Sequence, residues 1–393
     1  MPPAISELRT AISDLHHYLM KKHWNGRALE GPDSGVRWNF KIHRFLKSYL
    51  DFLPWKDRYI FLQTQGYWIL GNWLLAKHFD DGPHTELARA CAEYVASSQH
   101  PEGYWNYPPV PSRIGKVATV EGDFAAIGLA ESYRHTHDER LLAAAGKWND
   151  FLCRKIGYQE VEGTLAVNYW AGSRHDLPVP NNATLTLWAL AELADASGKE
   201  KFLLRCRGLV DFLRRAQLES GELPYSVAAN GRGGRPHFLC FQYNAFECLD
   251  LVYYYRLTGD AGVLPIVERL AAFLATGVLE SGAARYSCTR DKPEVPYYTA
   301  ALATALSQST ALGVGDYRRL AERAFRRLLS HCSPRRGIEF FSKGNYGLFT
   351  DRRSYPRNLA MILYHLALEL ETSVKSCDET VPFRVPVIHR GQP

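Results

Sequence analysis

The stretch Gln99-His100-Pro101-Glu102-Gly103-Tyr104-Trp105 follows an apolar helical pattern and brings a glycine and two aromatic residues directly after it. The same order of features recurs along the chain, with glycines at Gly35, Gly103, Gly163, Gly221, Gly282 and Gly337. The successive steps between these glycines are 68, 60, 58, 61 and 55 residues. A repeat of this length indicates an array of equivalent helical units.

Each interval holds two helix-length apolar patterns with turn residues between them. In the first interval Leu87, Cys91, Tyr94 and Val95 lie at i, i+4, i+7 and i+8, so they share one helical face. The predicted helix pairs are 65–79 with 85–98, 122–134 with 139–153, 182–195 with 199–216, 243–257 with 262–276, and 298–309 with 316–330.

Two further helical patterns, 5–22 and 356–371, have no partner next to them in the chain. Each predicted pair contains a first helix and a second helix. The numbers of first and second helices are equal only if 356–371 pairs with 5–22, and this pairing closes the chain into a ring. We therefore predict an all-α (α/α)6 toroid of six helical hairpins over residues 1–372, followed by a C-terminal tail over 373–393. An open solenoid, in which the two ends stay apart, is the alternative.

In a closed ring all inner helices begin at the same mouth, and the segments that enter them are polar and aromatic. Helix capping accounts for Asp and Asn at a helix start, but tyrosine has no capping advantage. We therefore predict the functional site at this mouth, and interpret Asp80-Asp81 at the opposite end as a turn between helices. The matching positions, about one repeat apart, are Gln65, Asp123, Asn182, Tyr243, Tyr298 and Asn358.

Composition narrows the class of protein. The chain has 47 basic and 41 acidic residues and a net charge of +6, which is too balanced for a nucleic-acid-binding protein. Its 46% hydrophobic content is typical of a globular chain, and no apolar run is long enough to cross a bilayer. The N-terminus lacks a signal-peptide pattern. We expect a cytoplasmic protein with no membrane span and no nucleic-acid partner.

The eight cysteines form no C-x-x-C pair, and we expect them to be reduced thiols. No ligand spacing predicts a metal site. Gly231-Arg232-Gly233-Gly234 lacks the Lys and Ser/Thr ending of a phosphate-binding loop, so no cofactor is expected.

The repeat plan resembles the alpha/alpha toroid enzymes. One branch of this class contains six-hairpin glycosidases, uronate lyases and glucuronyl epimerases; another contains terpenoid cyclases and protein prenyltransferases. The segment from Tyr94 to Trp105 resembles the Gln-Trp repeat of the terpenoid branch, and Gln217-Leu-Glu-Ser-Gly221 is a partial second copy. These strings match helix ends, and the Asp-x-Asp-Asp motif of protonating cyclases is absent. The Tyr, His, Asn, Arg and Glu residues at the mouth match the residue types that uronate enzymes use.

This resemblance implies a carbohydrate-active enzyme whose substrate is an acidic, uronate-containing oligo- or polysaccharide or another anionic small molecule. In a lyase or C5-epimerase, Arg235 or Arg357 would neutralise the uronate carboxylate. Tyr243, Tyr298 or His237 would serve as base and acid, with nearby arginines favouring the phenolate.

The other expected contacts to the sugar come from Gln65, Trp68, Asn182 and Asn244. If the chemistry is hydrolysis instead, Glu121 and Asp123 would be the two carboxylates. Two alternatives remain open. One is a terpenoid cyclase or prenyl diphosphate-processing enzyme on the same fold, and the other is a non-catalytic glycan-binding protein.

Overall fold

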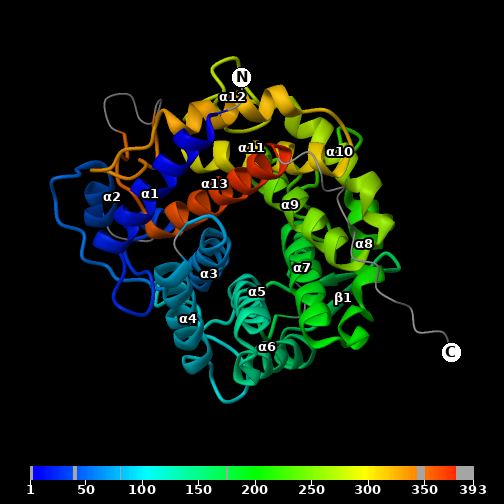
Figure 1. The fold of residues 1–393 in the computed structure, drawn as a ribbon. Helices are drawn as coiled ribbons and strands as arrows, with labels where there is room; N and C mark the ends of the chain where they lie inside the picture. The colour runs from blue at the N-terminus through cyan, green and yellow to red at the C-terminus, as the bar shows by residue number, and fades with distance from the viewer. Residues whose placement is uncertain (1–2, 39–41, 80, 174–175, 343–349, 378–393) are drawn as a thin grey trace.

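The computed structural model describes residues 3–38, 42–79, 81–173, 176–342 and 350–377. Within these residues, six inner helices surround the axis of a ring and six outer helices flank them (Figure 1). The inner helices are α3 (Leu62–Ala76), α5 (Thr119–Thr136), α7 (Pro180–Ser197), α9 (Cys240–Thr258), α11 (Pro296–Leu312) and α13 (Pro356–Cys377). The outer helices are α1 (Ile5–Lys22), α4 (Asp81–Ser97), α6 (Glu139–Phe151), α8 (Cys206–Ala216), α10 (Leu264–Ala275) and α12 (Arg318–Leu329).

The ring is closed by its two ends. Each inner helix packs against the next inner helix in chain order, and α13 packs against both α11 and α3. The first helix, α1, lies alongside α13, as Figure 1 shows in blue and red. The predicted closed toroid and the predicted pairing of the end helices are therefore confirmed, and the open solenoid is excluded.

Several short elements lie in the connections. The segment between α1 and α3 contains η1 (Ser34–Trp38) and α2 (Ile42–Tyr49). After α6 come η2 (Leu152–Ile156) and an antiparallel hairpin of β1 (Tyr158–Val161) and β2 (Thr164–Val167), in which Val161 pairs with Thr164. The turns η3 (Glu200–Leu203) and η4 (Ala261–Val263) precede α8 and α10. The sequence did not predict α2 or the hairpin, and α13 continues to Cys377, beyond the expected start of the tail.

The repeated glutamine and glycine form a clamp between neighbouring outer helices. The side-chain amide of Gln99 donates to the carbonyl oxygens of Gly103 and Ala144, at 3.1 and 2.9 Å. Gly103 has φ +95°, and a Cβ there would lie 2.5 Å from the carbonyl oxygen of Lys147, so only glycine fits. Gln217 repeats the arrangement with Gly221 and the carbonyl of Ile266. The motif therefore ties α4 to α6 and α8 to α10, which is the helix-end role that the sequence indicated.

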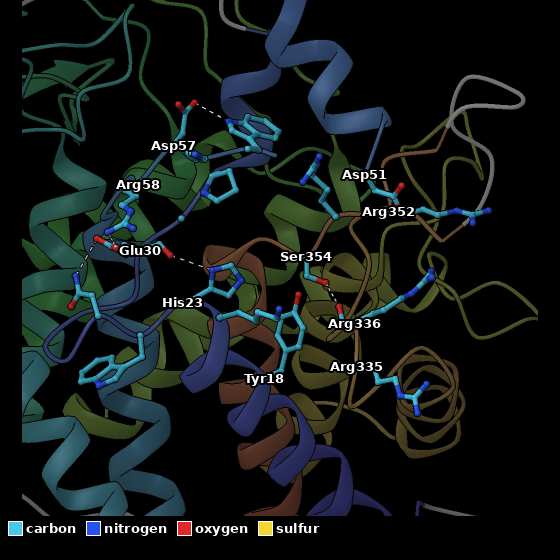
Figure 2. A pocket seen from close by; sticks show the side chains of 18 residues that line it. Tyr18, His23, Glu30, Asp51, Asp57, Arg58, Arg335, Arg336, Arg352 and Ser354 are labelled. Atoms are coloured by element: carbon cyan, nitrogen blue, oxygen red, sulfur yellow. Dashed lines mark hydrogen bonds and ion pairs between the residues drawn. The ribbon is translucent and has the colours of Figure 1, made fainter. Parts of the chain in front are cut away.

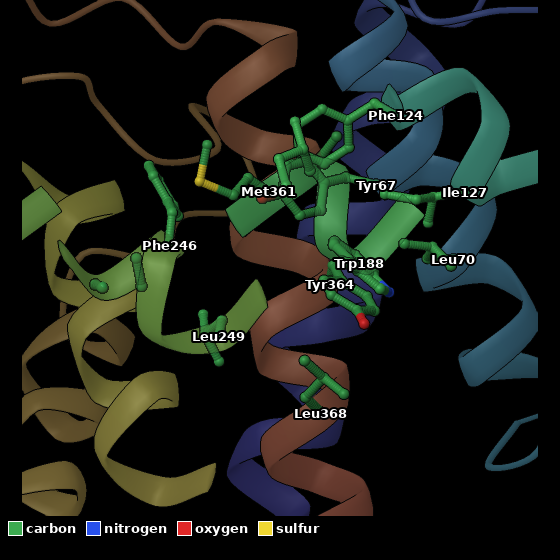
Figure 3. Close-up of a cluster of buried hydrophobic side chains, with 14 of the residues drawn as sticks. Tyr67, Leu70, Phe124, Ile127, Trp188, Phe246, Leu249, Met361, Tyr364 and Leu368 are labelled. Carbon is green, nitrogen blue, oxygen red and sulfur yellow. The ribbon is translucent and has the colours of Figure 1, made fainter. Parts of the chain in front are cut away.

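Below the mouth, large side chains from the inner helices meet near the ring axis (Figure 3). The rings of Tyr67 on α3 and Phe124 on α5 have centroids 4.8 Å apart, and Tyr67 also lies 5.7 Å from Tyr364 on α13. Trp188 on α7 meets Phe124 edge-on at 6.3 Å. These aromatic contacts join helices that are far apart in the sequence and fill the ring beneath its open end.

One cysteine pair differs from the expectation of reduced thiols. Cys240 and Cys288 form a disulfide, with their Cα atoms 6.1 Å apart. The ring brings the start of α9 next to the connection that enters α11, although the two residues are 48 positions apart in the chain. The free cysteines in the described part of the chain are Cys91, Cys153, Cys206, Cys248 and Cys332.

Among the helices of the described residues, none combines the length and apolar character that a bilayer crossing requires.

Candidate functional site

A cavity of about 550 Å³ opens at the mouth where the inner helices begin. This is the size range of small-ligand sites. Every inner helix contributes residues from its first turns, so the ring places side chains from distant repeats around one space. One lining residue from each inner helix in turn is Gln63, Glu121, Asn181, Tyr243, Tyr297 and Arg357.

Aromatic rings from the inner helices and from the connections form a collar around this cavity. Tyr225 meets Tyr243 edge-on at 5.2 Å, and Tyr286 stacks on Tyr298 at 5.8 Å. We use the name aromatic collar for Tyr107, Tyr169, Tyr225, Phe238, Tyr243, Tyr286, Tyr297, Tyr298, Phe340 and Phe341. The collar offers flat apolar faces combined with hydroxyl groups, which suits a ligand that has both apolar faces and polar edges.

Glu121 is a buried carboxyl group on the cavity wall. It is 1% exposed, and it accepts hydrogen bonds from the backbone N–H groups of Leu62 at 2.5 Å and Gln63 at 3.4 Å, which caps the start of α3. Burial raises its pKa to about 7, although Arg357 and the two N–H groups act in the opposite direction. A carboxyl group with this pKa is able to give or take a proton near neutral pH.

Two arginines line the same cavity. Arg357 forms an ion pair with the buried Asp33: Nε lies 2.8 Å from Oδ2, and Nη2 donates to Oδ1 at 2.8 Å. Its guanidinium also lies over the ring of Phe61, 4.7 Å from the centroid. Arg113 donates from Nη1 to the hydroxyl of Tyr107 at 2.7 Å and covers the ring of Trp170. Asp33 and Phe61 hold Arg357, and Tyr107 and Trp170 hold Arg113, so both guanidinium groups are fixed in the cavity wall.

Asp250 and Asp33 are further carboxyl groups in the cavity wall, and the sequence predicted neither. Asp250 accepts a hydrogen bond from Thr184 Oγ1 at 2.9 Å, and burial raises its pKa well above the ordinary range. Its place two helical turns after Tyr243, on the same face of α9, is the signal that would have found it. Asp33 lies outside the repeat, so no periodic signal marks it.

Two amide side chains in the wall keep unused hydrogen-bonding capacity. Gln242 Oε1 and Asn358 Nδ2 are buried, and neither has a hydrogen-bond partner among the described residues. Buried polar atoms are nearly always paired, so atoms of this kind in a cavity wall are suited to a polar ligand.

Four of the predicted site residues line the cavity: Glu121, Tyr243, Tyr298 and Arg357. The pKa directions of the two tyrosines do not favour the expected activation by arginines, however. Burial raises the pKa of Tyr243 and of Tyr298 well above the usual value, and the neighbours with the next largest effects are other tyrosines rather than arginines. These directions favour the protonated form of both phenols at neutral pH.

Other predicted residues turn away from the cavity. Asp123 accepts from Trp148 Nε1 at 2.8 Å and from Thr186 Oγ1 at 2.7 Å, between α5, α6 and α7, so it does not form a pair with Glu121 across a ligand. Gln65 bonds the backbone N–H and C=O of Leu29, and Trp68 stacks on His16 at 4.8 Å. All three side chains lie on the outward faces of their helices, α5 and α3, and therefore contact residues outside the inner ring.

The remaining predicted residues lie behind or beside the cavity. Asn182 is buried behind the wall, and its neighbour Asn181 lines the cavity instead. Asn244 accepts from the N–H of Leu223 and donates to its carbonyl. Arg235 is exposed on the rim, 3.8 Å from the centroid of the Phe238 ring. His237 is half exposed and lies 2.9 Å from Glu222.

Of the pair Asp80-Asp81, Asp80 lies outside the described residues, and α4 begins at Asp81.

A larger cavity, of about 1160 Å³, is lined by residues outside the inner helices, and Figure 2 shows its side chains. It is bounded by the end of α1, residues 23–32 and 51–58, and parts of the connection before α13. Several of its charges are already paired, including Arg58 with Glu30 at 3.1 Å, and Asp57 accepts from Trp55 Nε1. No described residue of an inner helix lines it, so the axial cavity is the better candidate for the predicted site.

No protein-family model matches the sequence, and no curated protein matches it. Solved structures with the same fold do. One is a cellobiose 2-epimerase from Bacillus thermoamylovorans, with a TM-score of 0.71, 13% identity, and coverage of 92% of this chain and 98% of that one. A possible member of the GH105 family from Salmonella enterica has a TM-score of 0.69, 15% identity, and coverage of 94% and 95%. An unsaturated glucuronyl hydrolase specific for heparin has a TM-score of 0.66, 14% identity, and coverage of 95% and 97%. The chain therefore shares the alpha/alpha toroid fold of carbohydrate-active enzymes.

Proposed function

We propose that this protein is an enzyme that acts on an acidic, uronate-containing oligo- or polysaccharide in the axial cavity. The observation that carries the proposal is Glu121, a buried carboxyl group on the cavity wall with a pKa near 7 and an arginine close by. The aromatic collar supplies stacking surfaces for sugar rings. Gln242 and Asn358 supply unused hydrogen-bonding atoms for hydroxyl groups. The similar solved structures include an epimerase and a uronate-processing hydrolase, which supports this substrate class.

The leading chemistry is proton abstraction next to a uronate carboxylate. Arg357 and Arg113 would bind the carboxylate and stabilise the negative charge that develops on it when the C5 proton leaves. Glu121, in its ionised form, would take that proton. A protonated phenol of the collar, such as Tyr243 or Tyr298, would donate a proton to the leaving oxygen in an elimination. In an epimerisation it would return a proton to C5 from the opposite face.

Hydrolysis is the second candidate, because Asp250 supplies a second buried carboxyl group in the same wall as Glu121. In that reaction one carboxyl group protonates the glycosidic oxygen. The other either activates a water molecule for attack or attacks the sugar with its own carboxylate oxygen. A terpenoid substrate is less suitable, because charged and amide groups interrupt the aromatic lining.

The test is turnover of a panel of uronate-containing oligosaccharides, each paired with its carboxyl-reduced form, in deuterated water. Elimination is detected by ultraviolet absorbance of the unsaturated product, epimerisation by deuterium at C5, and hydrolysis by new reducing ends without that absorbance. We expect one acidic oligosaccharide to react and its carboxyl-reduced form not to react.

The variant Glu121→Gln keeps an oxygen that accepts from the start of α3, so the fold should survive, but it cannot exchange a proton. We expect it to lose about 10²–10⁴-fold in rate, the usual size of a general acid–base contribution. Glu369→Gln is the matched control, because Glu369 is also buried with a pKa near 7 but lies late in α13, bonded to Ser307 and away from the cavity. Full activity of Glu121→Gln, or no turnover of any acidic saccharide by the wild type, would refute the proposal.

A further inference from the structure

Four side chains with metal-binding atoms meet at the rim, outside the axial cavity. They are Glu222 after the Gly221 clamp, His237 just before α9, Cys240 at the start of α9, and Cys288 in the connection before α11. Their donor atoms all lie within 4.8 Å of one another. No other group of this kind was found among the described residues.

The distances from Cys288 to Glu222 and to His237 match those between neighbouring donors in a tetrahedral zinc site. Zn–N, Zn–O and Zn–S bonds of about 2.0–2.3 Å place neighbouring donors about 3.3–3.8 Å apart. Cys288 Sγ lies 3.6 Å from both carboxylate oxygens of Glu222 and 3.8 Å from Nδ1 of His237. His237 Nδ1 lies 2.9 Å from the Glu222 carboxylate. Three of the four donors are therefore close to the required geometry, and the fourth, Cys240, is bonded to Cys288.

The burial of the cluster also favours a cation. Glu222 is 1% exposed, and Cys240 is 1% exposed. A buried carboxylate is unfavourable unless a positive group pairs with it. His237 supplies a neighbour, but its side chain is 57% exposed. A metal ion between these residues would neutralise the carboxylate from inside the cluster, with the exposed ring of His237 closing the site toward solvent.

We propose that Glu222, His237, Cys240 and Cys288 bind one Zn²⁺ ion when the Cys240–Cys288 disulfide is reduced. A dithiol reductant supplies two electrons and two protons: it becomes a cyclic disulfide, and the protein gains two thiols. Zn²⁺ then displaces one proton from each thiol, giving two Zn–S bonds and two released protons. Nδ1 of His237 and a carboxylate oxygen of Glu222 complete the four ligands. Two thiolates with one imidazole favour zinc over the oxygen-preferring Mg²⁺ and Ca²⁺.

The ion would hold two connections of the ring together. Residues 217–239 and 276–295 carry Tyr225, Phe238 and Tyr286 of the aromatic collar. Fastening these connections at the cluster would fix the positions of those rings at the cavity rim. The site would thus be structural, with four protein ligands and no open position.

The experiment measures metal binding in the full-length protein, independently of any activity. The protein is reduced anaerobically with a dithiol, loaded with Zn²⁺ or Co²⁺, and desalted, and its metal content is measured. We expect one Zn²⁺ per chain. With Co²⁺ we expect the thiolate charge-transfer band and the intense visible bands of a tetrahedral site. Protein kept oxidised should bind neither ion.

Cys288→Ser should lose the bound metal, whereas Cys332→Ser should keep it, because Cys332 is a partly buried free cysteine outside the cluster. Glu222→Gln leaves both thiols in place and should weaken zinc affinity at least about tenfold. The cobalt spectrum of the wild type needs no variant, so it decides the question even if Cys288→Ser does not fold. The proposal is overturned if the reduced wild type binds no stoichiometric metal, or if Cys288→Ser or the oxidised protein binds as much as the reduced wild type.

Discussion

Replacing Glu121 by glutamine should change how the stability of the protein depends on pH, whatever its substrate is. In the folded protein, burial raises the pKa of Glu121 from 4.5 to about 7. Between these two pH values the folded state holds a proton that the unfolded state has released. The free energy of unfolding therefore falls as pH rises through this window. Glutamine has no such proton, so the variant lacks this contribution.

The magnitude follows from the two pKa values. Each pH unit of difference corresponds to about 1.4 kcal/mol, so the full penalty above pH 7 is about 3 kcal/mol. Between pH 5 and pH 8 the free energy of unfolding of the wild type, relative to that of Glu121→Gln, should fall by about 2.5 kcal/mol. Urea denaturation of both proteins at several pH values measures this difference directly.

Glu369→Gln provides the comparison, because burial also raises the pKa of Glu369 to about 7. It should show a similar change in stability with pH but normal turnover, whereas Glu121→Gln should show both the stability change and the loss of rate. A stability difference between wild type and Glu121→Gln that stays constant from pH 5 to pH 8 would mean that Glu121 titrates at an ordinary pKa. The acid–base role assigned to it would then have no basis.

Three further changes test other parts of the structure. Gly103→Ala should lower the free energy of unfolding by about 2–4 kcal/mol in urea titrations, because Gly103 has a positive φ and an added Cβ would collide with the backbone. The control is Gly146→Ala, which should be neutral or stabilising because an added Cβ there contacts nothing. Asp33→Asn should lower the free energy of unfolding by about 3 kcal/mol in the same assay, because it leaves the largely buried Arg357 without its charge partner. A loss below about 1 kcal/mol would mean that this ion pair contributes no more than an exposed one. Tyr243→Phe and Tyr298→Phe should keep the melting temperature while at least one loses turnover about 10²–10⁴-fold, and normal turnover in both would remove these hydroxyls from the mechanism.

The fold was accessible from the sequence because the repeat leaves a local mark in every unit. Gly103 and Gly221 follow the equivalent helices α4 and α8, and each has a glutamine four residues earlier that bonds both the glycine and the next outer helix. The closure of the ring followed from two helices without neighbours in the chain, and α1 does pack on α13. In contrast, α2 is short and lies in a connection outside the repeat, so no periodic pattern predicted it.

The site could be predicted only in part from the sequence. The position of a residue in a repeat indicates which turn of a helix it occupies, but it indicates less reliably the direction in which the side chain points. Glu121 and Asp123 are two residues apart, or about 200° around a helix, so one reaches the cavity and the other bonds Trp148 on the outer side. Asp33 and the Cys240–Cys288 pair depend on contacts between distant segments, which a single sequence does not display.

The common direction of the inner helices has an electrostatic consequence. Each helix start carries a partial positive charge from its first backbone N–H groups, and because six starts surround one mouth their contributions add there. This potential comes from the backbone and does not titrate. The opposite mouth collects the negative helix ends, where the guanidinium of Arg134 lies among Glu131, Glu192 and Asp195. The backbone of the toroid thus forms a dipole along the ring axis, with its positive end at the cavity.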